Sequence, residues 1–277
     1  MIMLGSINSL MISEVCAEGA YLDGKELGEV FLPAQELEEH LEAGDSVQVF
    51  IFQDAQGHPT ATTKTPIAQV GQFALLRVKA LSTVGAFMDI GIDKDVLAPF
   101  NEQKPKMREG HSYLVRLYLD NASKRLCASS NLNKFLNKTE PNYSKFEEVD
   151  LIVAAKTDLG YKVIINEQHF GVVFFNTVFK RMFMGQKLKG YIKSVREDGK
   201  IDVVLEKPGM GKVVDLGEQI LQALNDNGGY LPLGDKSDPE QIKKAFATSK
   251  ANYKKAIGGL FKQGKINIEA KSISLKK

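Results

Sequence analysis

A motif that occurs three times constrains the fold of this 277-residue sequence more than any other feature. A glycine opens the pentapeptides GAYLD, GAFMD and GYKVI, and a second glycine follows each first one 25 residues later. An alternating stretch that predicts a β-strand comes next, at 47–51, 113–117 and 188–192. Short strands separated by Gly and Asp turns at a constant spacing indicate three small antiparallel β-barrels. The glycine pairs are Gly19/Gly44, Gly85/Gly110 and Gly160/Gly185.

Strand alternation in the second repeat predicts which side chains face outward. Arg77 and Lys79 are expected on the outer surface, and Phe87 is expected outward on the next strand. An outward aromatic ring beside cations is a platform for stacking a base, worth ~1–3 kcal/mol per base. The alternative is that a neighbouring domain covers Phe87. The expected inward residues are Leu76, Val78, Ala80, Met88 and Ile90.

These stretches resemble the S1 RNA-binding domain, an OB-fold barrel. GAFMDIG at 85–91 is similar to that family's Gly-Ala-Phe-Val-Asp-Leu-Gly signature. LPAQEL at 32–37 and APFNEQ at 98–103 resemble the Val-His-Ile-Ser-Glu-Leu element that follows it. The resemblance implies that the stacking aromatic falls on Phe87, on Tyr21 in the first repeat and on Lys162 in the third, where Tyr161 is adjacent. It also assigns the charged positions of the last hairpin to Asp120 and Arg125, with His58 and Lys200 at the basic position of the other repeats.

From residue 215 onward the apolar period becomes helical. The pattern predicts a helix over 216–224, a second from a cap at Asp238 to Phe246, and a third that Ser249 caps and Gly264 ends. A two-stranded hairpin is expected at 266–269 and 272–275. Three helices followed by a hairpin resemble a winged helix. The expected buried stripe of the third helix is Tyr253, Ile257, Leu260 and Phe261.

The stripe leaves Lys250 and Lys254 of the third helix facing solvent, where they can contact phosphates. The alternative is an ordinary solvated helix face. Lysines alone give non-specific, salt-sensitive binding. Three such barrels followed by a winged helix are similar, over nearly the whole chain, to the bacterial conserved virulence factor B family. That resemblance implies an RNA-binding regulatory protein that prefers single-stranded segments and has no catalytic activity.

The net charge of +2 conceals a strong asymmetry along the chain. Residues 1–65 carry 2 basic and 11 acidic residues (−9), whereas the next three segments, 66–140, 141–208 and 209–277, are at +4, +2 and +5. Such asymmetry indicates a charged partner for the basic segments. We expect the acidic first barrel to repel phosphate and to serve as a structural or protein-contacting member.

Composition and motifs favour a soluble, non-enzymatic protein. Hydrophobic residues make up 43% and charged residues 25%, and no apolar run reaches the ~18 residues that span a bilayer. Two distant cysteines favour a reducing cytoplasm. No Walker loop, nucleophile elbow or metal-ligand spacing occurs, so we expect no cofactor and no metal. We interpret 209–212 as a flexible linker and the acidic run at 36–39 as a solvated helix face.

The sequence therefore predicts a mainly β multidomain protein: S1-like barrels at 1–65 (acidic, degenerate), 66–140 (with a linker) and 141–208 (degenerate), then a winged helix at 209–277. The first hypothesis is a post-transcriptional regulator that holds single-stranded RNA with barrels two and three and the winged helix. The alternatives are a DNA-binding transcriptional regulator that reads through the winged helix, and a translation-associated protein-interaction scaffold. A monomer and a dimer fit the sequence equally. The candidate RNA contacts are Arg77, Lys79, Phe87, Asp120, Arg125, Tyr161, Lys162, Lys193, Lys200, Lys250 and Lys254.

Overall fold

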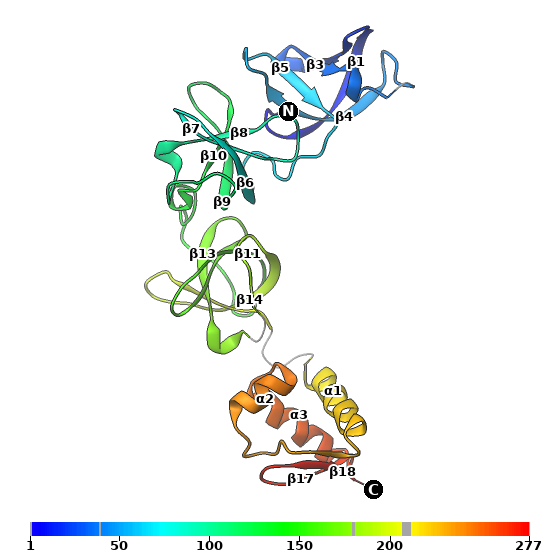
Figure 1. Ribbon diagram of the computed structural model, residues 1–277, viewed down its shortest axis with the longest axis vertical. Helices are drawn as coiled ribbons and strands as arrows, with labels where there is room; N and C mark the ends of the chain where they lie inside the picture. Colours follow the sequence, from blue (N-terminus) through cyan, green and yellow to red (C-terminus); the bar gives the residue numbers. More distant parts are fainter. Residues whose placement is uncertain (1, 39, 179–180, 207–211, 277) are drawn as a thin grey trace. The chain divides into compact units, whose positions relative to one another are not determined.

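The computed structural model describes residues 2–38, 40–178, 181–206 and 212–276 (Figure 1). It divides into two compact units, 1–138 and 139–277. The first unit holds two closed five-stranded barrels, and the second holds a third closed barrel and a helical segment with a small sheet. The predicted fold class, three OB-type barrels followed by a winged helix, is confirmed.

The three barrels have one topology. In each barrel the first three strands form an antiparallel meander, and the third strand closes the barrel through a parallel pair with the fifth. The first barrel consists of β1 (Ile7–Cys16), β2 (Gly19–Asp23), β3 (Glu29–Pro33), β4 (Ser46–Gln53) and β5 (Pro59–Thr62). The second consists of β6 (Phe73–Leu81), β7 (Gly85–Met88), β8 (Val96–Pro99), β9 (Ser112–Leu119) and β10 (Leu126–Ser129). The third consists of β11 (Glu148–Lys156), β12 (Gly160–Ile165), β13 (His169–Phe174), β14 (Lys187–Val195) and β15 (Ile201–Val204).

The repeated glycines serve two structural purposes. A Cβ atom on Gly19, Gly85 or Gly160 would clash with a backbone carbonyl of the next strand, so the strands approach too closely for any side chain there. The second glycine of each pair has a positive φ, at +100°, +75° and +80°, which only glycine adopts freely. The 25-residue spacing is therefore the length of chain between a close strand crossing and the turn that enters the fourth strand.

A β-bulge in the first strand of every barrel corrects one predicted orientation. The register shifts between Ile12 and Glu14, between Val78 and Ala80, and at the equivalent place in β11. Because the bulge interrupts the alternation, Ala80 is exposed rather than inward. The other four residues expected inside the second barrel are buried as predicted.

The first and second barrels share packing, as expected for units of this size. Phe50 of β4 is 1% exposed and belongs to the core of the second barrel. The Val70 N–H donates to the Gly5 carbonyl at 2.7 Å, and Lys64 forms an ion pair with Asp93 at 2.6 Å. The Ile7 N–H donates to Gln69 Oε1 at 2.9 Å, and Arg125 Nη2 donates to the Ala55 carbonyl at 2.7 Å. The end of the first barrel is therefore a structural part of the second.

In each of these two barrels a glutamate hydrogen-bonds to the end of the last strand; Glu36 is half-buried and Glu102 is buried. Glu36 ends the 3-10 turn η2 (Ala34–Glu36), and its carboxylate accepts from the Thr62 hydroxyl at 2.5 Å. Glu102 ends η3 (Phe100–Glu102) and accepts from the Ser129 hydroxyl at 2.6 Å and from Lys134 at 2.5 Å. The interpretation of the acidic run as a solvated helix face is therefore wrong for Glu36, because its carboxylate completes a hydrogen-bond network.

The C-terminal segment has the predicted helices with one extra strand. Asp238 and Ser249 cap their helices as expected, accepting from backbone N–H groups at 2.7 and 3.2 Å. The sheet has three strands rather than two, because Tyr230–Leu231 pairs with the second strand of the hairpin. Phe261 is 55% exposed, so it lies outside the buried stripe. The elements are α1 (Lys212–Asp226), β16 (Tyr230–Leu231), α2 (Pro239–Phe246), α3 (Lys250–Lys262), β17 (Ile266–Ile268) and β18 (Ile273–Leu275).

The predicted linker at 209–212 lies outside the described residues up to position 211, and Lys212 opens α1. Three further single 3-10 turns are η1 (Lys25–Leu27), η4 (Leu132–Lys134) and η5 (Phe175–Thr177). Within the part of the chain that the structure describes, no helix is long and apolar enough to cross a bilayer.

Candidate nucleic-acid interface

The strand registers align the three repeats residue by residue. Immediately after the bulge, the first strand pairs with Tyr21 in barrel one, Phe87 in barrel two and Lys162 in barrel three. These are the positions that the resemblance assigned to the stacking aromatic. Phe87 is half-buried on the outer side of β7, where its strand neighbour is Leu97 of β8.

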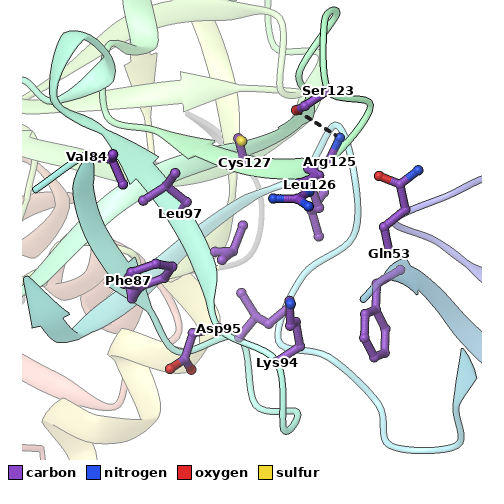
Figure 2. Close-up of a pocket in the computed structure, with 13 residues that line it drawn as sticks. Gln53, Val84, Phe87, Lys94, Asp95, Leu97, Ser123, Arg125, Leu126 and Cys127 are labelled. Carbon is purple, nitrogen blue, oxygen red and sulfur yellow. Dashed lines mark hydrogen bonds between the residues drawn. The ribbon is translucent and has the colours of Figure 1, made fainter. Parts of the chain in front are cut away.

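Phe87 lines a cavity of about 320 Å³ that lies against both barrels of the first unit (Figure 2). The floor is apolar and comes from β7, β8 and β10 of barrel two, including Leu97 and Leu126. Phe52 and Gln53, at the end of β4, belong to barrel one. Figure 2 shows Gln53 on the side opposite Val84 and Phe87, with Arg125 between them.

Arg125 is the second predicted residue at this cavity. Its Nη2 donates to the Ala55 carbonyl of barrel one at 2.7 Å, which holds the guanidinium beside the opening. A guanidinium has five N–H donors, so most of them remain for a ligand. The expected Phe87 and Arg125 are therefore brought together.

Asp120 shapes the hairpin that carries Arg125. Its carboxylate accepts from the Ser123 N–H and hydroxyl, both at 2.8 Å. The Ser123 N–H bond, then the hydroxyl bond, hold the pKa of Asp120 below its ordinary value. Because Asp120 does not line the cavity and its Oδ2 accepts both bonds from Ser123, we assign Asp120 a positioning effect rather than a ligand contact.

The two predicted cations of β6 differ in their surroundings. Lys79 lies 2.9 Å from the Asp95 carboxylate and 3.6 Å from that of Asp89, so its charge is largely offset. Arg77 is exposed opposite Ser112 of β9 and is not part of the cavity lining. Neither side chain is gathered with Phe87 in the way the sequence suggested.

Sequence reasoning missed Lys94, which lines the cavity from the loop between β7 and β8. It is half-buried, and within the described residues it forms no ion pair. Asp93 and Asp95 flank it in sequence, but they pair with Lys64 and Lys79 instead. A count of charges along the sequence does not reveal this lysine, because the two aspartates beside it make the local net charge negative.

Cys127 also lines the cavity, and it is not a reactive thiol. Burial raises the pKa of the Cys127 thiol to about 11, so it is protonated near neutral pH. Within the described ranges no cluster of three or more His, Cys, Asp or Glu residues can hold a metal ion. The cavity therefore presents two aromatic rings, apolar surface, two cations and the carboxylate of Asp95, which forms an ion pair with Lys79.

The expectation that Tyr161 stacks a base is wrong. Tyr161 is 6% exposed in the core of barrel three, where its ring meets Phe175 edge-on at 5.3 Å. Its hydroxyl accepts from the Met182 N–H at 3.3 Å. The reason is alternation: Tyr161 shares a face with the buried Val163, so it occupies the inward position next to the stacking site.

Barrel three instead presents cations on half-buried rings. Lys162 lies 3.6 Å from the centroid of the Phe170 ring, and burial lowers the pKa of Lys162. The Arg196 guanidinium lies 5.7 Å from the Phe174 ring and is also held by Asp202 at 2.8 Å. The alternating run HFGVVF at 169–174 places Phe170 and Phe174 on one face, and this alternation is the sequence signal that points to them.

The remaining predicted cations are exposed to different degrees. Lys193 is exposed on β14, while Lys200 forms an ion pair with Asp198 at 2.6 Å. On α3, Lys254 forms an ion pair with Asp235 at 2.6 Å, and Lys250 at the start of the helix is half-buried. The expected lysine face of the winged helix is thus partly neutralised.

Known protein families match the chain in a barrel and in the winged helix. An S1 domain model matches residues 4–64, and a model of the CvfB-like winged helix domain matches residues 218–275. The chain is 28% identical to conserved virulence factor B of Staphylococcus haemolyticus over 99% of this chain and 95% of that protein. It is 27% identical to the Staphylococcus aureus N315 protein of the same name, over 99% and 94%. A multidomain protein with nucleic acid binding domains from Streptococcus pneumoniae aligns at 25% identity over 98% of both chains, with a TM-score of 0.42.

Barrels of the S1 type followed by a CvfB-like winged helix define a multidomain protein built from nucleic-acid-binding domains, which are not enzymatic families. Over nearly its full length the chain is similar to the conserved virulence factor B proteins of staphylococci, the family that its sequence pattern resembles.

Proposed function

We propose that this chain binds single-stranded RNA as a non-catalytic, cytoplasmic post-transcriptional regulator. Barrels two and three and the winged helix provide the binding surfaces. The observation that carries the proposal is the cavity in which Phe87 and Arg125 meet Lys94, which has no ion-pair partner among the described residues. An aromatic face stacks a base irrespective of its identity, and the cations attract the backbone phosphates beside it.

Single-stranded RNA is favoured over duplex DNA because the exposed feature is an aromatic face within a pocket. Bases of a duplex are stacked on one another and cannot reach such a pocket, whereas unstacked bases of a single strand can. The partly neutralised α3, where Lys254 is paired with Asp235, is a weaker candidate for reading a major groove.

The double variant Phe87→Ala/Arg125→Ala tests the proposal in a fluorescence anisotropy titration with single-stranded RNA. We expect at least a ~10-fold loss of affinity, equal to ~1.4 kcal/mol, because a stacking ring and a phosphate contact are removed together. Phe100→Ala/Lys106→Ala is the matched control: these residues form an aromatic-cation pair at 5.7 Å on the same barrel and do not line the cavity.

Unchanged affinity of the Phe87→Ala/Arg125→Ala variant would remove the second barrel from the binding surface. Competition of the labelled RNA with duplex DNA of matched length tests the polymer class in the same assay. Tighter binding of the duplex would favour the alternative of a DNA-binding regulator that uses the winged helix.

A further inference from the structure

The cavity between barrels one and two contains a polar group that the fold leaves without a partner. The Oε1 atom of Gln53 is shielded from solvent and has no hydrogen bond to any residue that the structure describes. Buried side-chain oxygens are nearly always satisfied, and an unsatisfied one costs about 1–3 kcal/mol, so the exception requires an explanation. A ligand that donates to this amide would supply one.

The remaining lining restricts the shape of such a ligand. The cavity of about 320 Å³ is at the small end of the range for ligand pockets, about 300–1,000 Å³. The ring of Phe87 and the side chain of Leu97 form an apolar wall on barrel two, and Phe52 adds a second ring from barrel one. One planar, largely apolar group fits this space, whereas a continuous stretch of polymer does not.

The charges define what is attached to the planar group. Lys94 has no ion pair within the described residues, and Arg125 keeps donors beyond the one bound to Ala55. Both cations line the same cavity as Gln53. Asp95 lines it as well, and its carboxylate is paired with Lys79 at 2.9 Å, so the two cations still outweigh it. A planar base attached to phosphates meets these requirements together: ring surface, an edge with donors and acceptors, and flanking negative charge.

We infer that this junction takes one unstacked nucleobase of a single RNA strand, whose edge hydrogen-bonds to the amide of Gln53. The inference rests on the proposed function and adds to it a base-reading contact from barrel one. An amide presents an acceptor beside a donor, and glutamine pairs in this way with the N6 and N7 atoms of adenine. Adenine is therefore the base for which the contact is expected to be strongest. Rotating the amide exchanges Oε1 and Nε2, so both hydrogen-bonding directions are available.

The variant Gln53→Leu removes the amide and keeps a side chain of similar size. The full chain and this variant are titrated by anisotropy with octamers of adenosine, cytidine, guanosine and uridine, and with an abasic octamer that has only the sugar-phosphate backbone. We expect Gln53→Leu to bind the adenosine octamer at least about fivefold more weakly than the unmodified chain does. For the abasic octamer we expect the two proteins to have equal affinity.

Gln56→Leu is the matched control, because Gln56 is exposed in the same β4–β5 turn and does not line the cavity. The thermal midpoint of Gln53→Leu is measured as a second readout. It is expected not to fall, because the substituted amide oxygen has no partner in the free protein.

Equal affinities of Gln53→Leu and the unmodified chain for all four base-bearing octamers would overturn the inference while leaving RNA binding intact. An equal loss on the abasic octamer would overturn it as well, because the effect would then not depend on a base. If the unmodified chain binds none of the octamers, the proposed function itself fails.

Discussion

Barrels one and two have the same fold and opposite charge. Both have the same strand order, a bulge in the first strand, a glycine at the close strand crossing and a glutamate that fastens the last strand. Both place an aromatic residue at the stacking position, Tyr21 in one and Phe87 in the other. Yet residues 1–65 carry a net charge of −9, and residues 66–140 carry +4. Inward residues and glycines thus specify the barrel, while outward residues, which are free to vary, determine what it can bind.

The S1 domain model matches the acidic barrel, at residues 4–64. A match to a domain family reports the fold of the barrel and leaves the charge of its outer surface open. In barrel one the Tyr21 ring lies 5.5 Å from Phe31, and the barrel has only Lys25 and Lys64 as cations. Lys25 is paired with Asp23 at 2.6 Å and Lys64 with Asp93 of barrel two. The first barrel therefore offers a ring with little positive charge beside it.

The acidic barrel nevertheless contributes to its neighbour through the end of β4. Phe50 is part of the core of barrel two, and Phe52 and Gln53 of the same strand line the shared cavity. Charge alone therefore separates the two barrels too strictly. That barrel one makes no phosphate contacts stays a prediction, but its residues at the junction help to form the surface of barrel two.

The largest expected effect concerns this structural role. Replacing Phe50 by Ala removes a ring that is 1% exposed, and we expect it to lower the free energy of unfolding by ~3–5 kcal/mol. Urea denaturation followed by circular dichroism measures the change. Phe100→Ala is the control, since Phe100 is 44% exposed and is expected to change stability by less than ~0.5 kcal/mol. Equal stability of the two variants would show that barrel two does not depend on barrel one.

The next effect concerns Glu102, which hydrogen-bonds to the last strand of barrel two. Burial raises the pKa of Glu102, but the bonds from Lys134 and Ser129 outweigh it and hold the pKa below the ordinary value of 4.5. A carboxyl with a lowered pKa in the folded state stabilises the fold above about pH 4.5, and this stability is lost as the pH falls through the lowered pKa.

We therefore expect Glu102→Gln to destabilise barrel two by about 1–3 kcal/mol at pH 7 and to flatten the loss of stability in acid. Thermal melts between pH 7 and pH 3 measure both effects. The control is Glu109→Gln, because Glu109 is exposed on the same barrel. A pH profile of Glu102→Gln that is as steep as that of the unmodified chain would contradict the assignment.

The barrels and the winged helix could be predicted from sequence because they depend on local spacing. Glycines at a fixed separation, caps such as Asp238 and apolar periodicity are all written in consecutive residues. The prediction for Tyr161 was wrong because Tyr161 lies one residue before the stacking position, and successive residues of a strand point to opposite faces. Ala80 was misplaced because a bulge leaves no mark in the apolar pattern.

Gln53 and Lys94 could not be found from sequence for a different reason. Each becomes a candidate only when the end of β4 docks against the loop between β7 and β8, about 40 residues apart in the chain. The way in which two folded barrels pack together depends on the surfaces of both, and no short sequence motif encodes it. Phe87 and Arg125 could be named from sequence because they lie at fixed offsets within one repeat, and their contact with RNA stays a prediction.

The smallest effect, and the most direct test of the difference between the two barrels, is a titration of single-stranded RNA against the matched variants Phe87→Ala and Tyr21→Ala. Both remove a ring from the equivalent position of the same fold. We predict that Phe87→Ala weakens binding by about 5- to 10-fold, whereas Tyr21→Ala changes it by less than about twofold. Equal losses, or a loss confined to Tyr21→Ala, would contradict the claim that outward charge and not fold decides which barrel holds RNA.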